Sequence, residues 1–198
     1  STFILFDDAW VLPLWTKTGN PAVSNGIISF VSGQAIQSPG TYSPGSALGY
    51  RANFKGGSSS YKWAGFISGS IPPFTYIGVA QDQGPSLILT NYILGPRGAS
   101  SLGAIGNAFH VYELGWVPGE TKAYVDHSSA PMGTLNVQVP TGALPVGINN
   151  YSDVTYGLEV DWIYVRKFGT CNPSSTVAGE QVGCRPEVCN GLDDDCDG

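Results

Sequence analysis

The C-terminal segment 187–198 carries the densest group of side chains in the chain that could bind a metal ion. Asp193, Asp195 and Asp197 alternate along it and are followed by Gly198, as in the first half of a D-x-D-x-D-G calcium loop. Alternate carboxylates on a tight loop face one centre, glycine permits the turn, and Ca²⁺ takes about six to eight oxygen ligands. We therefore predict a calcium site. Its expected ligands are Asp193, Asp195, Asp197, Asn190 and Glu187. The alternative is a solvated acidic tail.

All four cysteines lie in the same region of the chain: Cys171, Cys184, Cys189 and Cys196. An even count in a short Gly/Pro-rich segment predicts two disulfides, with three possible pairings. A Cys189–Cys196 bridge would close the acidic loop and leave Cys171–Cys184, but the other pairings stay open. Zinc is less favoured because no C-x-x-C pair occurs. Disulfides indicate an oxidising compartment, so we expect a secreted or cell-surface protein.

The formal net charge of −6 is concentrated near the C-terminus. Residues 1–170 hold eight Lys/Arg and nine Asp/Glu, whereas residues 171–198 hold one basic and six acidic residues. Nucleic-acid binding requires a basic surface, and the sequence offers none, so we exclude that class of partner. No apolar run approaches the roughly 18 residues of a membrane-spanning helix, so we expect no membrane span.

The rest of the chain must supply the scaffold, and its pattern is that of short strands. In residues 46–54, for example, apolar side chains alternate at Leu48, Tyr50, Ala52 and Phe54. About twelve such segments, the apolar run 10–15 among them, are separated by Gly/Pro turn signals, and none keeps a helical apolar stripe. The pattern predicts an all-β, antiparallel β-sandwich (jelly roll) with an extended cysteine-rich C-terminal arm. The expected divisions are a sandwich over 1–168, a linker or arm over 169–186, and the acidic, disulfide-clamped motif over 187–198.

Three segments resemble known families. The sequence HVYELGWVPG at 110–119, followed by KAYVD at 122–126, resembles a strand pair of concanavalin A-like and laminin-G-like jelly rolls. The segment GLEVDWIYVRK at 157–167 is similar to the closing strand of secreted jelly-roll modules. Residues 187–198 resemble a metal-binding motif of bacterial surface and secreted proteins. The resemblance implies a jelly roll over residues 1–168 and a metal site in the tail.

Such jelly rolls include glycoside hydrolases, which use a pair of carboxylates about 5–10 Å apart. The nearest match to their E-x-D-x-x-E strand contains Glu159 and Asp161, but Tyr164 occupies the place of the second glutamate. We therefore predict no catalytic residue and a protein that is not an enzyme. Glu159 and Asp161 are interpreted as a surface pair facing Arg166 or Lys167. His110 and His127 are expected to be structural.

Two functions remain. The first is a calcium-binding structural or adhesive building block of the cell surface, which self-assembles head-to-tail with identical subunits into fibres through its C-terminal arm. The second is a carbohydrate-binding module that stacks sugars on loop aromatics. The five tryptophans and ten tyrosines provide candidates, but most tryptophans in such strands are core residues, so the better candidates are Tyr42, Phe74, Tyr92 and Tyr151. The sequon Asn150-Tyr151-Ser152 predicts a glycan on Asn150, in an expected loop.

Overall fold

A computed structural model describes residues 3–7, 10, 12–56, 61–68, 75–82, 84, 86–93, 96–104, 106–152 and 157–168. Several predicted features therefore lie outside the described residues. They are the arm 169–186, the calcium motif 187–198 with Glu187, Asn190, Asp193, Asp195 and Asp197, the four cysteines Cys171, Cys184, Cys189 and Cys196, and Phe74.

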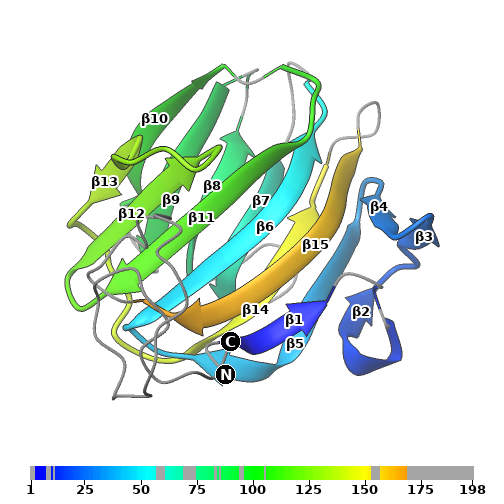
Figure 1. Ribbon diagram of the computed structural model, residues 1–198, viewed down its shortest axis with the longest axis horizontal. Helices are drawn as coiled ribbons and strands as arrows, with labels where there is room; N and C mark the ends of the chain where they lie inside the picture. Colours follow the sequence, from blue (N-terminus) through cyan, green and yellow to red (C-terminus); the bar gives the residue numbers. More distant parts are fainter. Residues whose placement is uncertain are drawn as a thin grey trace, which may run out of the picture.

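The described chain forms two antiparallel sheets that lie face to face (Figure 1). The A sheet has eight strands in the order β13-β12-β11-β6-β15-β4-β3, with β1 also paired to β15. Its strands are β1 (Phe3–Asp7), β3 (Ala22–Ser24), β4 (Ile27–Phe30), β6 (Ser46–Phe54), β11 (His110–Val117), β12 (Glu120–Val125), β13 (Gly133–Leu135) and β15 (Leu158–Lys167). This architecture confirms the predicted antiparallel jelly roll.

The B sheet has seven strands in the order β10-β9-β8-β7-β14-β5-β2. They are β2 (Thr16–Thr18), β5 (Gln34–Tyr42), β7 (Tyr61–Ser68), β8 (Thr75–Asp82), β9 (Ser86–Ile93), β10 (Gly98–Ala104) and β14 (Leu144–Asn150). A single 3₁₀ turn, Leu12–Leu14, completes the regular structure of the described residues. None of the described segments is a helix long and apolar enough to cross a bilayer.

The core lies between the sheets and is filled by alternate residues of each strand. Leu48, Tyr50, Ala52 and Phe54 of β6 are all buried in it, as the alternation predicts. Aromatic rings join the two sheets, because the ring of Trp116 on β11 lies 5.2 Å from that of Phe66 on β7. The sandwich is therefore held mainly by apolar burial, and its two outer faces remain for other roles.

Some predicted elements are wrong in detail. The apolar run 10–15 is not a strand, since Trp10 has a left-handed φ of 50° and the 3₁₀ turn follows it. Strand β5 was missed because Pro39 and Gly40 suggest a loop; they lie where the register against β14 shifts, a position that tolerates proline. Strand β10 was missed because its small residues carry little strand propensity.

Candidate functional site

The outer surface of the B sheet carries a second hydrophobic cluster, separate from the core. Trp63, Ile67, Tyr76 and Ala80 are buried there. They face outward because the intervening residues of β7 and β8, such as Phe66, occupy the core. Half-buried Tyr61, Ile88 and Tyr92 pack against them. We call this surface the B face, and it also includes Asp82, Arg97 and Tyr151.

Five aromatic rings cross the B face in a continuous series, which we call the aromatic strip. The rings of Tyr92 and Tyr76 are stacked with centroids 5.5 Å apart, and the ring of Trp63 lies 6.3 Å from Tyr76. Trp63 in turn stacks on Tyr61 at 5.9 Å, and Tyr61 meets Tyr151 edge-on at 6.2 Å. Tyr151 is 40% exposed, so the strip ends in an accessible ring. Aromatic faces attract C–H groups that carry partial positive charge.

Glycines lie beneath the centre of the strip. Gly65 of β7 is paired with Gly78 of β8 on one side and with Gly147 of β14 on the other. A Cβ atom added at Gly65 would lie only 2.1 Å from the Ile77 carbonyl oxygen. This row of the sheet therefore accepts no side chain, and the larger rings of Trp63 and Tyr76 flank it.

Two polar atoms of the B face are buried without a hydrogen-bond partner among the described residues. One is the indole Nε1 of Trp63, a donor, on a residue only 6% exposed. The other is Oδ1 of Asp82, an acceptor, on a side chain only 9% exposed. Trp63 is paired with Ala80, and Asp82 follows two residues later on the same side of β8, so the two are diagonal neighbours. Leaving such groups unpaired costs about 1–3 kcal/mol each, which is why most buried polar groups have partners.

Arg97 is a positively charged residue of the B face. Its guanidinium forms an ion pair with Oδ2 of Asp82. Burial raises the pKa of the Tyr76 hydroxyl, and side-chain hydrogen bonds with Thr90 and Arg97 only partly offset that rise. Arg97 therefore neutralises Asp82 and helps to hold Tyr76 in the strip.

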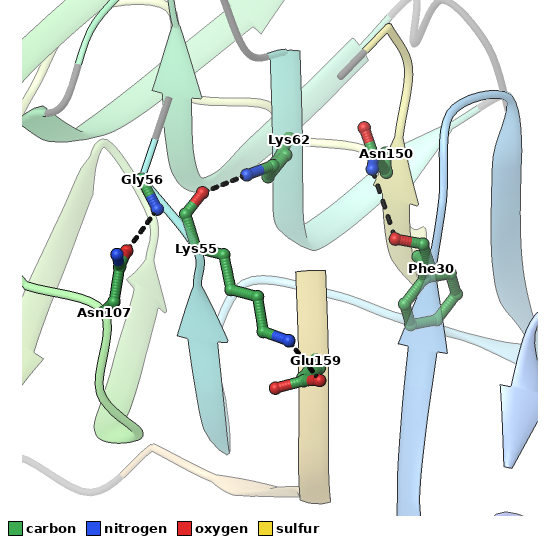
Figure 2. A network of polar contacts seen from close by, with 7 residues as sticks. All are labelled: Phe30, Lys55, Gly56, Lys62, Asn107, Asn150 and Glu159. Carbon is green, nitrogen blue, oxygen red and sulfur yellow. Dashed lines mark hydrogen bonds and ion pairs between the residues drawn. The ribbon is translucent and has the colours of Figure 1, made fainter. Parts of the chain in front are cut away.

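A separate polar network ties strand ends together beside the core (Figure 2). The fully buried Lys62 donates to the carbonyl of Lys55 and, at 3.3 Å, to Oε1 of Gln81. The Lys55 ammonium lies 2.5 Å from Oε1 of Glu159. These contacts join β6, β7, β8 and β15, so we assign Lys62 a structural role.

The placement predicted for Asn150 is wrong, because this residue ends strand β14 and does not lie in a loop. Its side chain is fully buried, and Nδ2 donates to the Phe30 carbonyl at 3.2 Å (Figure 2). Since N-glycosylation modifies that nitrogen, the folded sandwich disfavours the predicted glycan at this position.

The carboxylates singled out in the sequence lie on the opposite sheet. Asp161 of β15 pairs with Arg51, and Glu159 pairs with Lys55, so the expected partners Arg166 and Lys167 are wrong. No group of three or more His, Cys, Asp or Glu residues that could hold a metal occurs in the described part of the chain.

The two histidines sit near the turn after β12. His110 Nδ1 lies 2.7 Å from Oδ2 of Asp126, and Asp126 Oδ1 accepts the Val111 amide at 3.0 Å. This contact fastens β11 to the turn, where Asp126 and His127 both adopt left-handed φ values. His110 therefore has a structural contact, as expected.

The aromatic residues predicted to stack on sugars lie in two different parts of the sandwich. Tyr92 and Tyr151 belong to the aromatic strip, whereas Tyr42 is buried in the core beside Phe66. Trp63 and Tyr76 were among the aromatic candidates but were ranked below the loop aromatics, Trp63 because most tryptophans in such strands are core residues. A signal was present: in residues 61–67 both alternating sets of positions are largely apolar, which indicates a strand buried on both faces.

Comparisons with known proteins place the fold. No protein-family model matches the sequence, and no curated protein matches it. Among solved structures, the endo-β-1,3-glucanase of Pyrococcus furiosus is similar with a TM-score of 0.65 and 14% identity, over 84% of this chain and 94% of that one. The β-glucanase of Bacillus licheniformis gives 0.60 and 16% identity, over 83% and 98%. A family 16 glycosyl hydrolase of Mycobacterium smegmatis gives 0.62 and 12%, over 82% and 99%.

These neighbours correct one prediction. We expected a protein that is not an enzyme, but the sandwich has the jelly-roll fold of family 16 glycoside hydrolases, which is an enzyme fold. The expectation rested on residues 159–164, which lie on β15 of the A sheet and are engaged in ion pairs. That strand is on the other side of the sandwich from the aromatic strip, so its missing glutamate carries no information about the B face.

Proposed function

We propose that this protein is a carbohydrate-active jelly roll that binds a polysaccharide on its B face. The observation that carries the proposal is the pair of buried polar atoms without described partners, Trp63 Nε1 and Asp82 Oδ1, within an aromatic surface. One atom donates and the other accepts, so together they suit a ligand whose groups do both. Sugar hydroxyls have this property, and the C–H faces of sugar rings suit the aromatic strip.

The electrostatics of the B face favour an uncharged chain. Asp82 and Arg97 are paired with each other, so they offer no net charge to a ligand. We therefore propose that the B face binds a neutral polysaccharide, and cleavage is measured in the same experiment.

Affinity electrophoresis tests this proposal. Gels contain laminarin, chosen because one structural neighbour is named an endo-β-1,3-glucanase, or mixed-linkage β-glucan or xylan. We expect at least one of these polymers to retard the protein, and we expect Tyr151→Ala to weaken the retardation about 3- to 10-fold by removing an accessible ring. Leu14→Ala, which alters an exposed apolar side chain in the 3₁₀ turn, is the control. Release of reducing ends from the same polymers measures cleavage. Absence of retardation in all three would contradict the proposal.

Calcium binding by residues 187–198 and an extracellular location remain proposals supported by sequence alone. Calorimetry with CaCl₂ tests the first: we expect Asp193→Asn combined with Asp195→Asn to abolish the binding heat. Quantifying thiols in the secreted protein tests the second, and we expect no free thiol. The described residues give no support to head-to-tail assembly through the arm.

A further inference from the structure

The outer face of the A sheet carries a pair of aromatic rings on β15, Trp162 and Tyr164, which we call the A-face platform. The two rings are nearly parallel, with an interplanar angle of 14° and centroids 5.7 Å apart. Both residues are only half-buried, while Ile163 between them lies in the core. The platform is therefore accessible from the side of the molecule opposite the B face.

A β-bulge turns Trp162 to this side. Leu158 and Val160 point into the core, so a regular strand would send residue 162 inward as well. The register against β6 shifts between Val160 and Trp162, and the inward positions move to Ile163 and Val165. Bulges often re-aim a side chain beside a functional site.

The ring of Tyr164 lies over Gly49 of the neighbouring strand β6. A Cβ atom at Gly49 of β6 would stand 2.1 Å from Cζ of this ring, so only glycine allows the arrangement. The Tyr164 hydroxyl donates to Oε2 of Glu113 at 2.9 Å, and Arg166 donates to Oε1 of the same carboxylate at 2.8 Å. Two strands and two hydrogen bonds therefore fix the plane of the platform.

An unpartnered polar atom lies beside the platform. Asn53 of β6 is only 7% exposed, and its Oδ1 has no hydrogen-bond partner among the described residues. Its neighbour on the same side of β6 is Arg51, the cross-strand partner of Trp162. Asn53 therefore places a buried acceptor, in need of a donor, diagonally next to the half-buried indole of Trp162.

We propose that the A-face platform is a second polysaccharide-binding surface, so that one molecule holds two chains on opposite faces. Parallel aromatic rings suit the C–H faces of sugars, and a sugar hydroxyl can donate to Asn53 Oδ1. The charges around the platform are paired as Arg51 with Asp161 and Arg166 with Glu113. A charged partner would have to break these pairs, whereas a neutral polysaccharide would not.

Bridging of polysaccharide-coated beads tests the second surface. Two bead populations of different colour carry laminarin, mixed-linkage β-glucan or xylan, and co-aggregation is counted by flow cytometry. We expect wild-type protein to join the two colours. We expect Trp162→Ala to lower co-aggregation at least fivefold. The amount of protein that binds to one bead population alone, through the B face, should fall less than twofold. Light scattering of the free protein accompanies each measurement.

The outcomes separate this inference from the proposed function. Undiminished bridging by Trp162→Ala, or bridging only by a dimer whose formation Trp162→Ala abolishes, overturns the A-face site. If Trp162→Ala loses all bead binding while Tyr151→Ala binds as well as the wild type, the B face is overturned as the ligand site and the A face is retained. A wild-type protein that binds none of the coated beads overturns both.

Discussion

At the residue scale, Trp63 combines two properties that rarely occur together: near-complete burial and an indole N–H without a described partner. Trp63→Phe keeps an aromatic ring but removes the N–H donor and part of the ring volume. We expect the free energy of unfolding to change by less than about 1.5 kcal/mol, because removing an unpaired polar group offsets the loss of ring volume. We expect laminarin affinity to fall about tenfold, since the donor no longer meets the sugar. Urea unfolding and affinity electrophoresis measure the two effects, and unchanged retardation would argue against Trp63 as a ligand contact.

Tyr164 makes a pH-dependent contribution to the A face. Burial, together with the nearby Glu113 carboxylate, raises the pKa of its hydroxyl to about 12 from an ordinary value of 10.0. The folded state therefore holds this proton more tightly than the unfolded chain does. The resulting stabilisation is fully present below pH 10 and is lost as pH rises from 10 to about 12. We expect Tyr164→Phe to flatten the fall in unfolding free energy over that range, as measured by urea titrations at each pH. A fall of equal steepness in the variant would contradict this assignment.

The sequence could identify some residues of the candidate site and not others. Tyr92 and Tyr151 were predicted as loop aromatics, although Tyr92 in fact lies within strand β9. Trp63 and Tyr76 lie in strands whose two faces are both apolar, and period 2 alone cannot say which face meets the other sheet. Asp82 was also missed. Its importance comes from the lack of a described hydrogen-bond partner for its buried Oδ1, and residue spacing along the chain does not reveal which polar atoms lie near it in the fold.

At the element scale, glycines decide where rings can lie on the sheets. Gly49→Ala would place a methyl group within 2.1 Å of the Tyr164 ring, so the ring must swing away and release Glu113. We expect a loss of about 1–2 kcal/mol in unfolding free energy and a loss of bead bridging. Gly142→Ala is the control, because a Cβ there meets nothing within 4 Å. Equal stability and equal bridging in the two variants would show that the glycine is not required.

The same scale shows how far the pattern of strands could be predicted. Alternation in residues 46–54 identified both the strand and its buried face correctly. The strand at residues 158–167 was also predicted, but the bulge before Trp162, which changes which residues point inward, was not. A bulge depends on pairing with another strand, so local periodicity does not contain it. The Pro39-Gly40 pair in β5 misled for the same reason.

At the scale of the whole molecule, the charge distribution predicts how binding responds to salt. The charges that flank the two aromatic surfaces are paired, and the net charge of −6 comes mainly from residues 171–198. Salt screens exposed charges from each other beyond the Debye length, which is about 10 Å at 0.1 M and about 3 Å at 1 M ionic strength. We expect polysaccharide affinity to change less than about twofold between about 50 mM and about 500 mM NaCl, because hydrogen bonds and stacking carry it. A steep decline in electrophoretic retardation with salt would indicate an ionic ligand instead.

The two outer faces of the sandwich have similar features. Its core is filled by inward residues of both sheets, while each outer face holds aromatic rings over glycines and at least one buried polar atom that has no hydrogen-bond partner among the described residues. It shares its fold with glucanases. Two binding faces would let one molecule join neighbouring chains, which the bead experiment measures.

The most direct test is a titration followed by ¹H–¹⁵N NMR of the tryptophan indoles. The chain has five tryptophans, and Trp63→Phe assigns the Trp63 signal by its disappearance. When laminarihexaose is added to wild-type protein, we predict that the Trp63 Nε1–H cross-peak moves with the fraction bound, while the signal of Trp116, which donates to the Pro140 carbonyl in the core, stays in place. A Trp63 cross-peak that remains fixed while the sugar binds would contradict the B face as the binding site.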